Sequence, residues 1–320
     1  MIQPAEKPWV IALMGPTASG KTALSIKLAQ TLAGEIIACD SRTIYRHMDI
    51  GTAKPSRSEQ DSIPHHLLDV VEPDQVYTVS QYQEEASAKL AEIVGRGRVP
   101  LVCGGTGFYA RALLEGLKIP EVAPQENLRA ELSARAETDG VESLRNLLRE
   151  LDPQSADKIG KNDKFRLIRA IEVSQVLGKP FSQAARREEI PYRVIWLGLT
   201  ADDREILKKR IRERIVAQLA EGLVDEVRTI YMQFGATQTI MNAITYKEYV
   251  KFIRGEYSLE EAYEASVQHT ISLAKRQLTW FRANPEIDWI SIDQKNLDQL
   301  FTESMIKISS KMACESSAAT

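Results

Sequence analysis

A short glycine-rich segment, placed between an apolar run and a helical pattern, constrains this chain more than any other feature. Residues 15–22 read GPTASGKT and fit the pattern G-x-x-x-x-G-K-[ST]. The preceding run, 9–14, is continuously apolar, which is typical of a strand buried on both faces, and residues 21–33 have the pattern of an amphipathic helix. Backbone N–H groups of such a loop, the helix N-terminus and the lysine all attract an anion.

The segment therefore predicts a phosphate-binding loop. Its predicted ligand residues are Gly15, Pro16, Thr17, Ala18, Ser19, Gly20, Lys21 and Thr22. The Thr22 hydroxyl is also the predicted protein ligand of a Mg²⁺ ion, which such loops hold together with phosphate oxygens.

Strand and helix patterns alternate along much of the chain. Further apolar runs end at Asp40, at residue 103, at residue 200 and at residue 292, with helical patterns between most of them. After the run at 193–200, apolar residues recur every fourth position from Leu207 to Val227. These patterns predict an α/β fold of the P-loop NTPase type, a mostly parallel sheet flanked by helices.

Strand patterns disappear between Pro120 and Pro191, where Leu, Ala, Glu and Arg recur at helical spacing. This predicts a helical insertion domain at 120–191 within a core made of 1–119 and 192–310. Residues 158–187 carry eight Lys and Arg side chains against two acidic ones, in a chain of net charge −3. Such a local surface can hold nucleic-acid phosphates. Residues 311–320 lack a periodic apolar face, and we expect them to be disordered.

The three cysteines are an odd number and lie far apart, which argues against a disulfide framework and favours a reducing compartment. The apolar run before the glycine loop is too short for a signal peptide or a membrane span. We expect a cytoplasmic protein without a membrane partner. His65 and His66 have no companions at metal-ligand spacing, so we expect no zinc site.

A phosphate-binding loop does not by itself define a reaction. A hydrolytic NTPase is expected to have an apolar strand that ends in a carboxylate, but the run at 99–103 ends in Gly104-Gly105-Thr106-Gly107. Asp40 does follow a strand, at the edge of the sheet where ligands bind. It is either the residue that accepts a proton from a nucleophile or an ordinary turn or helix-capping aspartate. Thr106 has the same two interpretations, because small hydroxyl residues are common in glycine turns.

Several strings, in order and across nearly the whole chain, resemble the bacterial tRNA dimethylallyltransferases. They are GPTASGKT at 15–22, CDS and IYRHMDIGTAKP within 39–55, HHLLDV at 65–70, GGTGFY at 104–109, RLIRAIEV at 166–173 with GKP at 178–180, and AKRQLTWFR at 274–282. The resemblance implies transfer of the dimethylallyl group from its diphosphate to N6 of adenosine 37, next to the tRNA anticodon, with release of diphosphate. It implies Mg²⁺ as cofactor and tRNA and dimethylallyl diphosphate as partners of a monomer.

The resemblance also implies roles for individual residues. Asp40 matches the family's base, Thr106 its threonine at the reacting centre, and Arg214 a residue that reaches the diphosphate. Without the resemblance, Arg214 and its basic neighbours would be interpreted as a solvated helix face. The implied tRNA contacts are Asp40, Ser41, Arg42, Thr43, Arg129, Phe165, Arg166, Leu167, Ile168, Arg169, Lys275 and Arg276.

The chain departs from the family pattern at five positions, most of them in segments expected to read the nucleic acid. They are Arg42, Thr43, Phe165, Thr245 (where the family has glycine) and Ile271. Three alternatives stay open: a dimethylallyltransferase acting on free AMP, ADP or ATP, a P-loop small-molecule kinase, and a nucleotide-binding module without catalysis. The basic insertion argues against the first, and the last gives Asp40 and Thr106 no task.

Overall fold

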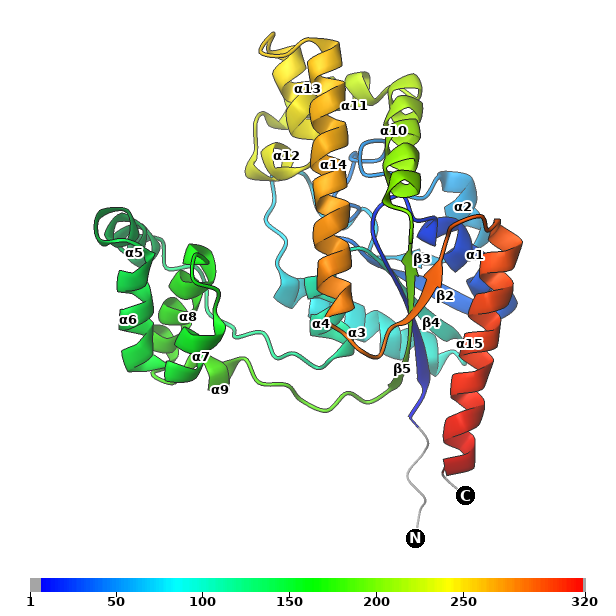
Figure 1. Cartoon of the computed structure of the whole chain (residues 1–320), viewed down its shortest axis with the longest axis horizontal. Helices are drawn as coiled ribbons and strands as arrows, with labels where there is room; N and C mark the ends of the chain where they lie inside the picture. The colour runs from blue at the N-terminus through cyan, green and yellow to red at the C-terminus, as the bar shows by residue number, and fades with distance from the viewer. Residues whose placement is uncertain (1–6, 319–320) are drawn as a thin grey trace. The chain divides into compact units, whose positions relative to one another are not determined.

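The computed structural model describes residues 7–318 (Figure 1). One six-stranded sheet has the order β3-β2-β4-β1-β5-β6, and every neighbouring pair is parallel. The strands are β1 (Trp9–Met14), β2 (Gly34–Cys39), β3 (His65–His66), β4 (Val99–Gly104), β5 (Arg193–Thr200) and β6 (Asp288–Ser291). The predicted α/β fold with a parallel sheet is confirmed.

The central strands end at the same edge of the sheet. Met14 of β1 and Cys39 of β2 both align with Gly104 of β4. The residues that follow these strands are Gly15, Asp40 and Gly105. The register therefore brings the glycine loop, the aspartate and the GGTG segment together, although they are far apart in sequence.

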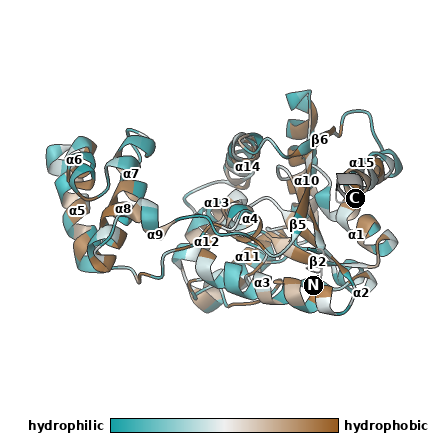
Figure 2. Ribbon diagram, turned by 90° about the horizontal axis from the view of Figure 1, so that it is seen from below, coloured by the Kyte–Doolittle hydropathy of each residue, from teal (hydrophilic) through white to brown (hydrophobic). Residues whose placement is uncertain are grey.

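Among residues 7–318, ten helices belong to the same unit of the chain as the sheet, wholly or in part. They are α1 (Lys21–Thr31), α2 (Arg57–Ser62), α3 (Val79–Gly95), α4 (Gly107–Leu114), α10 (Arg204–Ala220), α11 (Leu223–Phe234), α12 (Gln238–Asn242), α13 (Tyr246–Ile253), α14 (Leu259–Arg282) and α15 (Leu297–Ala318). Helices α1 and α15 pack together against the sheet, and α3 packs against β2 and β4. Figure 2 shows hydrophobic colouring along β5, in the middle of these layers.

Most of the apolar side chains that recur every fourth residue from Leu207 to Val227 are buried as predicted, but Leu219 is only half-buried, and the side chains lie on two helices, α10 and α11, and not on one. Leu207, Ile211 and Ile215 of α10 are buried with Ile11 and Leu13 of β1. The C-terminal helix corrects another expectation: α15 runs to Ala318, so residues 311–318 are helical, and the end of the predicted disordered tail lies outside the described residues. None of the helices in the described part of the chain is long and apolar enough to cross a membrane.

The second compact unit runs from Arg111 to Ile190, and the first comprises the residues before and after it. The sequence had placed the insertion at 120–191. Its helices are α5 (Glu126–Asp139), α6 (Val141–Leu151), α7 (Pro153–Lys158), α8 (Lys164–Leu177) and α9 (Phe181–Ala184). The unit has its own apolar core, in which Leu144, Leu148 and Leu167 are fully buried. A separate core explains how the insertion forms a unit of its own.

Polar groups inside the second unit are paired. The Arg145 guanidinium is buried and donates to the carbonyls of Ala156, Ile159 and Gly160 at the end of α7. Buried Asp152 accepts hydrogen bonds from Ser155 and from Ser182. Because an unpaired buried polar group is costly, these networks restrict how the short helices pack.

Candidate active site

The glycine loop curls between β1 and α1. Gly15 has φ +150°, and a Cβ atom there would lie 2.7 Å from the Leu199 carbonyl oxygen, so a side chain does not fit. Gly20 at the start of α1 has φ +89°. The Ser19 hydroxyl donates to the Pro16 carbonyl at 2.9 Å, which closes the turn. The loop is therefore shaped by its own sequence to present backbone N–H groups at the N-terminus of a helix.

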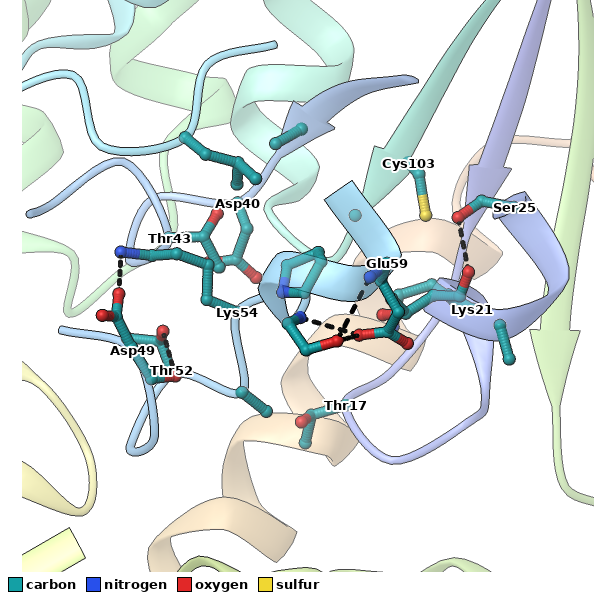
Figure 3. A pocket seen from close by; sticks show the side chains of 18 of the residues that line it. Thr17, Lys21, Ser25, Asp40, Thr43, Asp49, Thr52, Lys54, Glu59 and Cys103 are labelled. Carbon is teal, nitrogen blue, oxygen red and sulfur yellow. Dashed lines mark hydrogen bonds and ion pairs between the residues drawn. The ribbon is translucent and has the colours of Figure 1, made fainter. Parts of the chain in front are cut away.

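Lys21 supplies the positive charge of the loop. Its Nζ atom donates to the Pro16 carbonyl at 2.6 Å, and its side chain lines a cavity of about 800 Å³ (Figure 3). Burial lowers the pKa of Lys21 to about 8, and the charge of Arg214 acts in the same direction, whereas Cys103 and Asp40 oppose it. An anion bound in the loop would restore the charged form, because opposite charges favour each other.

Asp40 and Thr106 are linked through Ser41. The Ser41 N–H donates to the Thr106 hydroxyl oxygen at 2.9 Å, and the Thr106 N–H donates to the Cys39 carbonyl at 3.1 Å. The Asp40 Oδ1 atom accepts the Arg42 N–H at 2.9 Å, so the carboxylate does stabilise a turn, as one interpretation of the sequence had it. Within residues 7–318 its Oδ2 atom accepts no hydrogen bond, and the side chain lines the cavity that also contains Lys21. One oxygen thus shapes the loop, while the other is left without a hydrogen bond from the described residues.

A second cavity of about 460 Å³ adjoins the first. Ser41, Arg42, Thr106 and Arg276 line the second cavity only, and the glycine loop from Ala18 to Thr22 lines the first only. The residues common to both are Thr17, Asp40, Thr52, Arg214, Gln218 and Gln277. A molecule held by the glycine loop and a second molecule in the other cavity would therefore meet beside Asp40 and Arg214.

Arg214 differs from the basic residues around it on α10. Lys208, Lys209 and Arg212 pair with glutamates on the exposed face, as expected of a solvated helix surface. Arg214 instead donates to the Thr17 hydroxyl at 2.8 Å and to the Thr52 carbonyl at 3.2 Å. Burial lowers the pKa of Arg214, and the nearby Asp40 carboxylate opposes that shift. The guanidinium is thus a cation held at the glycine loop.

Gln277 is a site residue that the sequence analysis missed. Its Oε1 atom accepts the Thr17 N–H at 2.9 Å, and its Nε2 atom donates to the Gly105 carbonyl at 3.0 Å. A Cβ atom at Gly105 would lie 2.3 Å from the same nitrogen, so a larger residue there would displace the Gln277 amide. The only sequence signal was its place beside Arg276 in the string at 274–282. Gln277 joins the two glycine loops across the site.

The residues predicted to contact nucleic acid fall into different environments. Arg276 lines the second cavity and Lys275 is exposed beside it on α14. Thr43 is buried, with only 8% of its surface exposed. In the second unit, Phe165 is 84% exposed and Arg166 is exposed as well. The side chains of Leu167 and Ile168 are buried in the core of that unit, because they lie on the inner face of α8. Their contact with nucleic acid stays a prediction.

Arg129 and Arg169 both bind one buried glutamate. Arg129 donates to Glu172 at 2.7 and 3.0 Å, and Arg169 donates to it at 2.6 Å. Burial acts to raise the pKa of Glu172, but these arginines and the Gln125 N–H outweigh it and lower the pKa to about 2. Through Glu172, the two arginines connect α5 with α8 and so stabilise the second unit.

Thr245 lies in a conformation that a β-branched residue rarely adopts, with φ +76° and ψ −49°. It lines the second cavity, and its hydroxyl donates to the Gly51 carbonyl at 3.2 Å. Its N–H donates to Glu248 at 2.7 Å, and the other Glu248 oxygen lies 2.6 Å from Nδ1 of His269, which also lines this cavity. The position where the resembled family has glycine is therefore one where glycine would be unstrained.

The residues around the glycine loop suit a Mg²⁺ ion bound together with phosphates. Thr22 lines the first cavity, but no group of three or more His, Cys, Asp or Glu side chains within residues 7–318 could hold a metal alone. Mg²⁺ commonly takes most of its ligands from substrate phosphates and water. Thr22 would accordingly be the one protein ligand, with a diphosphate supplying the others.

Comparison with known proteins agrees with this arrangement. Residues 43–284 match the family model described as IPP transferase. The chain is 42% identical to a tRNA dimethylallyltransferase of Geobacter metallireducens, over 91% of this chain and 94% of that one, and 42% identical to that of Bacillus licheniformis, over 92% and 96%.

Solved structures show the same fold. The full-length tRNA isopentenylpyrophosphate transferase of Bacillus halodurans superposes with a TM-score of 0.74 at 35% identity, covering 98% of this chain and 99% of that one. The corresponding protein of Staphylococcus epidermidis gives a TM-score of 0.68 at 34% identity, covering 95% and 100%. With a family model that spans most of its length and relatives that match it nearly end to end, the chain belongs to the IPP transferase family.

Proposed function

We propose that the protein transfers the dimethylallyl group of dimethylallyl diphosphate to N6 of adenosine 37 in tRNA and releases diphosphate. The observation that carries this proposal is that Asp40 and Arg214 line both cavities. One cavity contains a phosphate-binding loop and the other contains Ser41, Thr106 and Arg276. The relatives named as tRNA dimethylallyltransferases support it.

The donor half of the reaction needs a stabilised leaving group. The backbone N–H groups of the loop, Lys21 and Arg214 surround the space where a diphosphate would sit, and they favour the negative charge that develops as the bond between C1 and oxygen breaks. A Mg²⁺ ion held by Thr22 and the diphosphate would neutralise further charge. No water has to be activated, which fits the lack of a carboxylate after β4.

The acceptor half needs a base beside the amine. As the N6 lone pair bonds to C1 of the dimethylallyl group, N6 loses a proton, and we assign the role of acceptor to Asp40, which lines this cavity and whose Oδ2 atom accepts no hydrogen bond within residues 7–318. Thr106 binds the Ser41 N–H and so holds the backbone next to Asp40. The electron pair of the breaking bond leaves with the diphosphate, so the step requires no oxidant or further reactant.

The tRNA provides an unpaired adenine, which costs little to turn into a cavity from a loop. Phosphate contacts are assigned to exposed basic residues such as Arg166, Lys275 and Arg276, and a stacking contact to Phe165. We propose that the protein does this as a cytoplasmic monomer. The eight basic residues between 158 and 187 favour tRNA over free AMP, ADP or ATP as the acceptor.

One incubation tests the proposal. The full-length protein is mixed with dimethylallyl diphosphate, Mg²⁺ and either unmodified tRNA or AMP, and the nucleosides are analysed by mass after digestion. The expected product is adenosine from tRNA that carries one dimethylallyl group. Prenylated AMP with unchanged tRNA would show a free-nucleotide enzyme, and transfer of phosphate from ATP without prenylation would show a kinase.

A further inference from the structure

A single glutamate of α11 binds a whole turn of backbone. One Glu226 oxygen, Oε2, accepts the N–H groups of Asp49 and Ile50 at 3.1 and 2.7 Å, and the other, Oε1, accepts the N–H group of Gly51 at 3.0 Å. The Tyr246 hydroxyl donates to Oε1 at 2.6 Å. Three successive N–H groups directed at one carboxylate form an anion-binding turn, here filled by a side chain of the protein itself.

The turn is connected to the candidate active site by hydrogen bonds to its carbonyl groups. The Thr52 carbonyl, one residue beyond the turn, accepts a hydrogen bond from Arg214 at 3.2 Å. The Ile50 carbonyl accepts one from Gln218, which lines both cavities. Arg214 has its other hydrogen bond to Thr17 in the phosphate-binding loop. The position of the turn therefore determines one of the two contacts that direct the Arg214 guanidinium.

Packing leaves the turn little freedom on the side of α13. A Cβ atom on Gly51 would lie 2.5 Å from the ring of Tyr246, which is fully buried. The Thr245 hydroxyl donates to the Gly51 carbonyl. Glu226 lines neither the cavity of the glycine loop nor the cavity beside it, so any effect it has on a molecule bound in either of them must pass through the turn.

We propose that Glu226 is a positioning residue for prenyl transfer, which holds residues 49–52 so that the Thr52 carbonyl and the Thr17 hydroxyl together direct Arg214 at the leaving diphosphate. The proposal rests on the function proposed above. Without the carboxylate, the three N–H groups lose their partner and the turn moves to satisfy them elsewhere. Arg214 then keeps Thr17 but loses Thr52, and its charge is no longer held where the diphosphate departs.

The test is a double-mutant cycle in the full-length protein, with Glu226→Gln, Arg214→Lys and the two combined. Glutamine keeps the shape of the side chain but presents an NH₂ group to at least one backbone donor. We expect Glu226→Gln to lower kcat by about tenfold in the wild-type background and by less than about twofold in the Arg214→Lys background. The KM for tRNA should stay unchanged. Asp225→Asn, the same charge change on the exposed neighbour, is the control and should leave all constants unaltered.

Calorimetric titration with inorganic pyrophosphate gives a readout that does not depend on transfer. Measured on the same four proteins, pyrophosphate binding should be weakened by Glu226→Gln when Arg214 is present and should be unchanged by it in the Arg214→Lys background. Equal losses in both backgrounds, in either measurement, would overturn the positioning role. If wild-type protein prenylates no tRNA, the proposed function fails, and the pyrophosphate cycle still decides whether Glu226 acts through Arg214.

Glu226→Gln could also reduce folding, which circular dichroism and thermal unfolding of each variant will show. In that case Tyr246→Phe takes its place, since it removes one hydrogen bond to Glu226 and leaves the three backbone contacts. A smaller loss in kcat, again confined to the background that contains Arg214, is expected. A loss of the same size in both backgrounds would contradict the proposal.

Discussion

The Arg214 guanidinium donates a hydrogen bond of 2.8 Å to the Thr17 hydroxyl and so joins the middle of α10 to the phosphate-binding loop. Both residues line both cavities. A diphosphate in the loop would find this cation already in place, so little reorganisation would be needed when the leaving group departs. This contact distinguishes Arg214 from Lys208, Lys209 and Arg212 of the same helix, which pair with glutamates at the surface.

Asp40→Asn should abolish turnover without disturbing the fold. Asparagine still offers Oδ1 to the Arg42 N–H, but its amide cannot accept a proton, and loss of a general base typically costs about 10²- to 10⁴-fold in rate. Pyrophosphate binding, measured by calorimetry, should stay within a few-fold of wild type. Asp225→Asn, an exposed carboxylate of α11 that lines neither cavity, is the control and should keep the wild-type rate. A fully active Asp40→Asn protein would remove Asp40 from the mechanism.

The rate at low donor concentration should fall as the pH rises through about 8. Burial lowers the pKa of Lys21 to about 8, so the free enzyme carries this charge below that pH and loses it above. Bound diphosphate favours the charged form, so kcat should fall only at higher pH than kcat/KM for dimethylallyl diphosphate. The Lys21→Arg variant should lose the decline in kcat/KM. A wild-type profile that stays level well above this pH would show that the lysine charge is not needed for binding.

Thr245→Gly should stabilise the protein by at most about 1 kcal/mol, because it relieves strain of about 1–3 kcal/mol that a β-branched residue carries at φ +76°. The greater freedom of glycine in the unfolded chain and the loss of the hydroxyl bond to the Gly51 carbonyl offset part of this gain. Urea unfolding gives the difference. Thr229→Gly, on the exposed face of α11, is the matched control and should be destabilising, as glycine is in a helix. Equal destabilisation by both substitutions would show that Thr245 is not strained.

The free energy of unfolding should contain a contribution from Glu172 that disappears in acid. The folded-state pKa, about 2, lies below the ordinary value of a glutamate, 4.5. The contribution is thus fully present above pH 4.5 and is lost as the pH falls through about 2, with an upper size of about 3 kcal/mol. The free energies of unfolding of wild type and Glu172→Gln, measured with denaturant between pH 6 and about 2, should become equal as the pH falls. Parallel curves would contradict the assigned role.

Neighbouring residues of α8 should give different phenotypes. Phe165→Ala should weaken tRNA binding by up to about 1–3 kcal/mol without altering its salt dependence, because a stacking contact involves no charge. Arg166→Ala should reduce by about 1 the slope of the logarithm of the tRNA binding constant against the logarithm of the salt concentration. Leu167→Ala should instead destabilise the fold by about 2–5 kcal/mol, because Leu167 is fully buried. Binding titrations at several salt concentrations, with unfolding curves, separate the three.

The local sequence pattern was sufficient to predict those parts of the structure whose conformation depends on consecutive residues. The run GPTASGKT predicted its own loop because the conformation of that loop depends on which positions are glycine and on the strand and helix beside it. The apolar runs predicted five of the six strands in the described part of the chain, and β3 was missed because His65 and His66 lie in no apolar run. The position of Asp40 at the end of one run predicted the edge of the sheet where it lies, since parallel strands end at a common edge.

Tertiary structure decided what periodicity left open. Arg214 was one basic residue among several on its helix, and only its contacts with Thr17 and Thr52 distinguish it. Glu226 gave no local signal and Gln277 only its place in the string at 274–282, because each binds backbone groups more than 170 residues away in the chain. Helical spacing alone likewise did not show which face of α8 was inside. Side-chain roles that depend on distant partners are set by packing, whereas loops and strands are set by the order of their own residues.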